Sequence, residues 1–77
     1  MKGFGYAQGN DDLLQEMAEI SIVATPNELR DTANFLLKCA DNIEADPYGW
    51  EHEHLADEYE GYADCVDIVV SNGTPKS

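Results

Sequence analysis

The sequence predicts a small α+β domain, in which one helix packs on one face of a four-stranded, mostly antiparallel sheet. Three observations lead to this fold class. Residues 26–45 have the capping signals and spacing of an amphipathic helix, and the segments on both sides alternate as strands do. A chain of 77 residues can also bury only one modest core. The expected element order is β-β-α-β-β, within a single domain.

The helix expected at 26–45 begins with clear signals. Thr25 suits the N-cap, a proline follows at the first helical position, and Glu28 completes a T-x-x-E capping box. Helical spacing then places five apolar residues on one stripe, which we expect to face the core: Leu29, Ala33, Leu36, Ala40 and Ile43. Phe35 and Cys39 fall at the shoulder of this stripe. The helix ends before the turn sequence DPYG.

Strands are expected on both sides of the helix. Upstream, residues 1–16 contain a possible first strand and a turn, and residues 17–24 alternate as a second strand. Downstream, residues 50–57 and 65–72 alternate in the same way. Residues 73–77 have the composition of a flexible tail. Together these strands would form the sheet that the helix covers.

The charge balance limits the classes of partner. The chain has 4 Lys and Arg against 16 Asp and Glu, so its formal net charge is −12. Ten of the acids lie between Lys38 and Lys76, with no basic residue among them. Such a surface repels phosphates, which argues against nucleic acid or an anionic membrane as a direct ligand. It favours a basic protein partner, cations, or simply solubility.

Two cysteines and the N-terminal sequence bear on location. The first twelve residues contain no apolar run of the signal-peptide type, and no run approaches membrane-spanning length. A small secreted domain usually has more than the two cysteines Cys39 and Cys65. We therefore expect a cytoplasmic protein with reduced thiols, although the spacing leaves the redox state of the pair open.

The stretch YGWEHEHLADEYEGYAD, residues 48–64, is the place where chemistry would lie. On a regular strand His52 and His54 point the same way and could share one divalent metal ion, but no third ligand can be assigned. The chain has no Gly-rich phosphate loop, no G-x-S-x-G and no H-E-x-x-H, so we do not expect an enzyme or another cofactor. The two histidines and Trp50 also fit one half-buried face of an ordinary strand.

A protein-binding surface is the alternative that the composition favours. Aromatic anchors supply contact area and acids attract a basic partner. The expected surface residues are Tyr48, Trp50, Glu51, Glu53, Asp57, Glu58, Tyr59, Glu60 and Tyr62. A homodimer joined through a strand edge or through Phe35 is a further alternative.

Part of the chain resembles a known family. The segment EISIVATPNELRDTANFLLKCADNIE, followed by WEHEHLAD and VDIVVSN, is similar to small α+β immunity proteins of bacterial polymorphic toxin systems. The resemblance covers Glu19 to Asn72, and His52, His54 and Leu55 carry its H-x-H-L element. It implies a cytoplasmic, non-catalytic antidote that binds a toxin domain. Many such toxins are nucleases with basic clefts, which an acidic inhibitor would cover.

Overall fold

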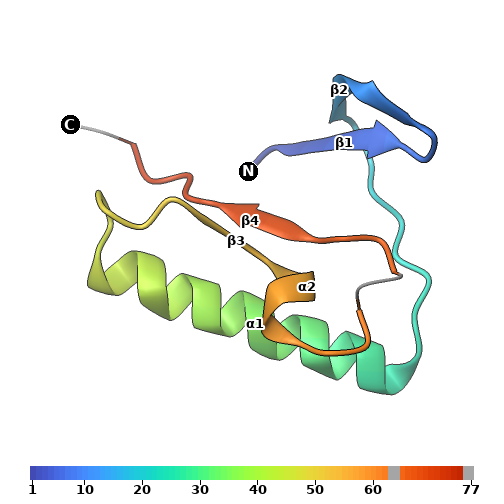
Figure 1. The fold of residues 1–77 in the computed structure, drawn as a ribbon. Coiled ribbons are helices and arrows are strands. Elements are labelled where there is room, and N and C mark those ends of the chain that lie inside the picture. The colour runs from blue at the N-terminus through green and yellow to red at the C-terminus, as the bar shows by residue number, and fades with distance from the viewer. Residues whose placement is uncertain (63–64, 76–77) are drawn as a thin grey trace.

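The computed structural model describes residues 1–62 and 65–75, and in these ranges it contains two helices and four short strands (Figure 1). The elements in chain order are β1 (Gly3–Ala7), β2 (Asn10–Met17), α1 (Pro26–Ala45), β3 (His52–His54), α2 (Leu55–Glu58) and β4 (Val69–Ser71). The α+β class predicted from the sequence is confirmed. Of the expected tail at 73–77, the last two residues lie outside the described ranges.

Helix α1 occupies the range that its capping signals predict. The hydroxyl of Thr25 accepts the backbone N–H of Glu28 at 3.2 Å, and the carboxylate of Glu28 accepts the backbone N–H of Thr25 at 2.8 Å. Two otherwise unpaired N–H groups of the first turn are thereby satisfied. The bond from the Thr25 backbone also lowers the pKa of Glu28. At the other end, the N–H of Asp46 donates to Asn42 and closes the last turn.

The strands form two separate antiparallel sheets of two strands each, so the single four-stranded sheet is not confirmed. Strand β1 pairs with β2, and β3 pairs with β4. Figure 1 shows the β1–β2 hairpin on the side of β4 that faces away from α1. The segment between β2 and α1 contains no strand, and therefore no ladder joins the two sheets.

The strand predicted at 17–24 is wrong. Strand β2 ends at Met17, and residues 18–25 form neither helix nor strand. The two-residue turn before β2 ends in Gly9, whose φ of 79° suits a glycine and folds the chain straight back onto β1. Pairing between such close neighbours costs little loop-closure entropy, so the upstream residues take the local partner.

The two downstream strands are shorter than predicted. After His54 the chain turns into α2, because two groups from the opposite segment satisfy the first N–H groups of that helix. The N–H of Leu55 donates to the Ile68 carbonyl at 2.8 Å, and the N–H of Ala56 donates to Asp67 at 3.3 Å. The strand expected at 50–57 is therefore limited to His52–His54, and the one at 65–72 to Val69–Ser71.

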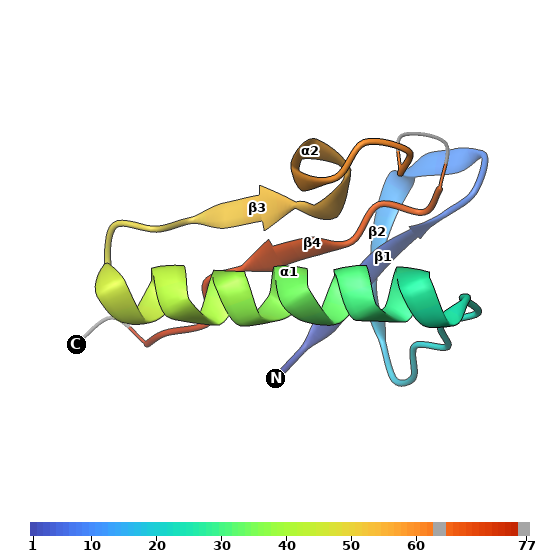
Figure 2. The same cartoon turned by 90° about the horizontal axis from the view of Figure 1, so that it is seen from below.

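The core lies between α1 and the β3–α2–β4 segment. Phe35 and Cys39 of α1 are each 1% exposed, and Leu55 of α2 is 2% exposed. Five partly buried residues pack around them: Trp50, Tyr59, Tyr62, Ile68 and Val70. Figure 2 shows β3 and β4 running alongside α1. The thiols of Cys39 and Cys65 are both free, the first buried and the second exposed.

The stripe of α1 that was predicted to face the core is wrong by part of a turn. Leu29 and Leu36 are 47% and 46% exposed, whereas Phe35 at the predicted shoulder is fully buried. Thr32 is also buried, and its hydroxyl donates to the Glu28 carbonyl at 2.8 Å. Two short strands cover only a narrow part of the helix surface. Phe35 occupies the covered part because burying its large ring removes the most apolar area from water.

Paired alanine substitutions test which stripe is the core. We expect Phe35→Ala to lower the free energy of unfolding by about 3–5 kcal/mol, because it leaves a cavity in a small core. We expect Leu36→Ala to cost only about 1 kcal/mol, because its side chain is already half in water. Urea unfolding followed by Trp50 fluorescence measures both. Equal losses would mean that the Leu36 stripe is covered instead.

Candidate partner-binding surface

The β3–β4 sheet has an inner face and an outer face. Directly opposed residues of antiparallel strands point to the same side, and Glu53 is opposite Val70. Because Val70 packs against the core, Glu53 faces α1. The histidines on either side of it, His52 and His54, therefore project from the outer face, away from the helix.

Two of the predicted surface acids are used within the chain. Lys38 of α1 donates to the carboxylate of Glu58, and this bond raises the pKa of Lys38. The charge of Glu53 raises the pKa of Lys38 as well. The positive charge of Lys38 is thus paired with a carboxylate of the same chain. Glu58 and Glu53 are half-buried on the side of α1, so less of each carboxylate is available to a partner protein.

Most of the predicted aromatic anchors pack inward. Trp50, Tyr59 and Tyr62 pack against the core, and the rings of the two tyrosines meet edge to face at 6.1 Å. The hydroxyl of Tyr62 donates to Asp31 at 3.0 Å. Loss of water, followed by the bond to this carboxylate, raises the pKa of Tyr62 to about 12. Tyr48 alone among the four predicted aromatics is exposed, at 63%.

Tyr48 stands in the turn that follows α1, and local contacts shape this turn. The carbonyl of Asp46 accepts the N–H of Trp50 at 3.0 Å, and its carboxylate accepts the N–H of Gly49 at 3.1 Å. A Cβ atom at Gly49 would lie 2.3 Å from that carboxylate, so a larger residue there would displace the Asp46 side chain and its bond to the turn. The turn is therefore encoded in the DPYG sequence itself.

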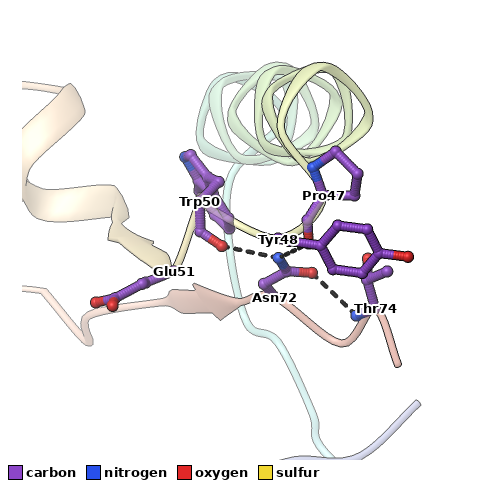
Figure 3. Close-up of a pocket in the computed structure, with 6 residues that line it drawn as sticks. All are labelled: Pro47, Tyr48, Trp50, Glu51, Asn72 and Thr74. Atoms are coloured by element: carbon purple, nitrogen blue, oxygen red, sulfur yellow. Dashed lines mark hydrogen bonds between the residues drawn. The ribbon is translucent and has the colours of Figure 1, made fainter. Parts of the chain in front are cut away.

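A hollow of about 260 Å³ lies beside Tyr48, where this turn meets the end of β4 (Figure 3). It is lined by Pro47, Tyr48, Trp50, Glu51, Asn72 and Thr74. The side-chain nitrogen of Asn72 donates to the carbonyls of Pro47 and Trp50, both at 2.7 Å. Its side-chain oxygen accepts the N–H of Thr74 at 2.9 Å. One side chain thus ties the turn to the C-terminal segment.

Asn72 was missed by the sequence reasoning. An asparagine before Gly-Thr-Pro looks like an ordinary turn residue. The sequence contains no signal that its side chain forms hydrogen bonds with a segment more than twenty residues away.

The outer face of β3 carries an ordered histidine. Nδ1 of His54 lies 2.6 Å from Oδ2 of Asp67, and Oδ1 of Asp67 accepts the N–H of Ala56. The bond to Asp67 raises the pKa of His54. The rings of His52 and His54 meet edge to face, with centroids 5.5 Å apart. In residues 1–62 and 65–75, no group of three metal-type ligands gathers around them or elsewhere.

Four of the nine predicted surface residues are thus exposed, namely Tyr48, Glu51, Asp57 and Glu60. Tyr48 and Glu51 precede β3 in the chain, whereas Asp57 lies in α2 and Glu60 in the turn after it. The other five are half-buried. The structure therefore leaves a smaller accessible set than the sequence predicts, because a small domain uses most of its aromatic side chains for its core.

Comparison with known proteins finds one family. The family model described as Immunity protein 32 matches residues 19–73. This range includes α1, β3, α2 and β4, and it leaves out the β1–β2 hairpin. Searches of curated proteins and of solved structures return no significant match. Within the described ranges, no helix is long and apolar enough to cross a membrane.

Removing the charge of Asp67 tests the ordered histidine. We expect Asp67→Asn to lower the pKa of His54 toward its ordinary value, because the acceptor loses its negative charge. A raised pKa in the folded state stabilises the fold below about 6.5, and this stabilisation is lost as pH rises through the raised pKa. The variant should therefore lose that pH dependence. NMR titration of the His54 ring protons measures the shift. Asp57→Asn removes a weaker influence on His54 and should produce a smaller shift.

Asn72 offers a second test. Asn72→Asp keeps the shape of the side chain but replaces its N–H donors with a carboxylate, which faces the carbonyl oxygens of Pro47 and Trp50. We expect a loss of about 1–3 kcal/mol in the free energy of unfolding, because two carbonyl groups lose their partner. Asn34→Asp adds the same charge on the exposed side of α1 and is the matched control. Similar urea midpoints for the two variants would contradict the proposed role of Asn72.

Proposed function

The chain belongs to the immunity protein 32 family, and from this premise we propose that it binds a cognate bacterial toxin domain and neutralises it without catalysis. The match over residues 19–73 is the observation that carries the proposal. Such a protein acts by occupying the surface that its target needs, and so its function depends on shape and charge. We further propose that it acts in the cytoplasm, against a toxin of the polymorphic type.

We place the contact on the exposed residues Tyr48, Glu51, Asp57 and Glu60, which we name the acidic surface. Two observations support this placement. No basic residue lies between Lys38 and Lys76 in the sequence, and Lys38 is bonded to Glu58. The exposed acids therefore have little opposing charge nearby. Such a surface attracts a basic partner and speeds its association.

Tyr48 is the proposed anchor within the acidic surface. Its ring is largely exposed, and it borders the hollow beside Trp50 and Asn72. Tyrosine gives large contact area at little cost in conformational entropy, and aromatic residues dominate the energy of many interfaces. Because Asn72 and the DPYG turn fix the backbone around it, the side chain is presented from an ordered segment.

Charge steering is tested by removing three exposed acids together. We expect Glu51→Gln, Asp57→Asn and Glu60→Gln in one chain to slow association about tenfold and to flatten its salt dependence, because steering depends on unscreened charge. The probe is the toxin domain that co-purifies with the tagged chain from its native host, and association is measured by stopped flow. Asp12→Asn, Glu16→Gln and Glu19→Gln remove the same charge upstream of α1. An equal effect of this control set would show that only net charge matters.

The anchor is tested separately from the charge. We expect Tyr48→Ala to weaken the complex by about 30-fold or more, mainly through faster dissociation, because it truncates a central contact worth about 2 kcal/mol. Leu37→Ala truncates a similarly exposed residue on α1 and should change the affinity little. Equal affinity of the Tyr48 variant and the wild type would move the interface away from the acidic surface.

A further inference from the structure

The outer face of β3 is not used by the proposed toxin contact, although it carries two histidines. His52 and His54 alternate with Glu53 on a strand, and both project away from α1. Their backbone positions are held by pairing with β4, which places Ser71 and Val69 opposite them. Both neighbours are small, and both are exposed. His52 is exposed and the side chain of His54 is 39% exposed, so solvent reaches both imidazoles.

The separation of the two rings suits one shared ion. Two imidazoles bound to a tetrahedral metal at about 2.0–2.1 Å hold their ring centres roughly 5 Å apart. The centroids of His52 and His54 are 5.5 Å apart, with an angle of 72° between the ring planes. The spacing of the two rings is therefore compatible with one ion held between them.

Asp67 supplies the second observation. Its Oδ2 lies 2.6 Å from Nδ1 of His54, and its Oδ1 accepts the N–H of Ala56. A neutral His54 in this contact donates from Nδ1, so that the lone pair remains on Nε2. Metal-binding histidines usually donate their other ring N–H to a carboxylate in this way, which orients the ring and increases its basicity. Such an arrangement is more specific than two histidines on a strand.

We propose that His52 and His54 form a two-histidine site for a divalent transition cation such as Zn²⁺, with Asp67 as the orienting carboxylate. Imidazole nitrogen suits Zn²⁺, Ni²⁺ and Cu²⁺ and does not suit Mg²⁺ or Ca²⁺, which prefer oxygen. No third His, Cys, Asp or Glu of residues 1–62 and 65–75 joins the pair. The ion therefore keeps open positions that face solvent, where water or a donor atom of a bound protein completes the coordination.

Titration of the full chain with ZnCl₂ tests the proposal, with the histidine ring protons observed by NMR. We expect one ion to bind, with the ring signals of His52 and His54 shifting together. His52→Ala and His54→Gln should each abolish these shifts; glutamine retains a donor for Asp67, and circular dichroism checks the fold. We expect Asp67→Asn to weaken binding about 10- to 100-fold, because it removes the orienting charge.

Controls separate this site from other cation binding. Cys65→Ser should leave Zn²⁺ binding unchanged, because the exposed thiol is not a proposed ligand. MgCl₂ should leave the ring signals unshifted, because Mg²⁺ is attracted to the acidic chain but does not bind imidazole nitrogen. Zn²⁺ binding that survives either histidine substitution, or that is as tight in Asp67→Asn as in wild type, would overturn the proposal. The assay contains no toxin, so its failure would leave the proposed function intact.

Discussion

The packing of Phe35 and Cys39 of α1 against Leu55 of α2 is the contact on which the structure depends. These are the largest fully buried side chains among the described residues, and the partly buried aromatics gather around them. A chain this small has little other apolar burial with which to offset its conformational entropy and the repulsion among its acids. The positions of β3, α2 and β4 relative to α1 all follow from this contact.

The same core decides what remains for a partner. Three of the predicted anchors pack against the core cluster, namely Trp50, Tyr59 and Tyr62. Glu58 forms an ion pair with Lys38 of α1. The surface is therefore less aromatic than the sequence suggests, with Tyr48 as its exposed ring. The alternation of β3 separates two roles. Its inner face supports the core beside Glu53, and its outer face leaves two histidines and Asp67 accessible.

Local signals were enough for several predictions. The capping box of α1 depends on only two residues in one turn, Thr25 and Glu28, and the sequence predicts it directly, as it does the class of the fold. The H-x-H-L resemblance pointed to the immunity family, which the match over residues 19–73 confirms, although that match does not test the motif itself. By contrast, the stripe of Leu29 and Leu36 has ideal helical spacing and still lies half in water. Spacing predicts that a helix has an apolar side, but the width of the covering sheet decides which part is covered.

The sequence by itself determined α1, its caps, the DPYG turn, the excess of acidic charge and the alternation of His52 and His54, because each depends on neighbours within a few residues. The tertiary structure alone decided that the strands form two sheets, that Phe35 is central, and that Asn72 and Asp67 close on distant segments. Each possible long-range pairing gains free energy from its contacts and loses entropy when its loop closes. Which pairing is most stable depends on all such alternatives along the chain. For the same reason, core packing determines which acids and histidines are exposed, and the sequence alone does not predict them.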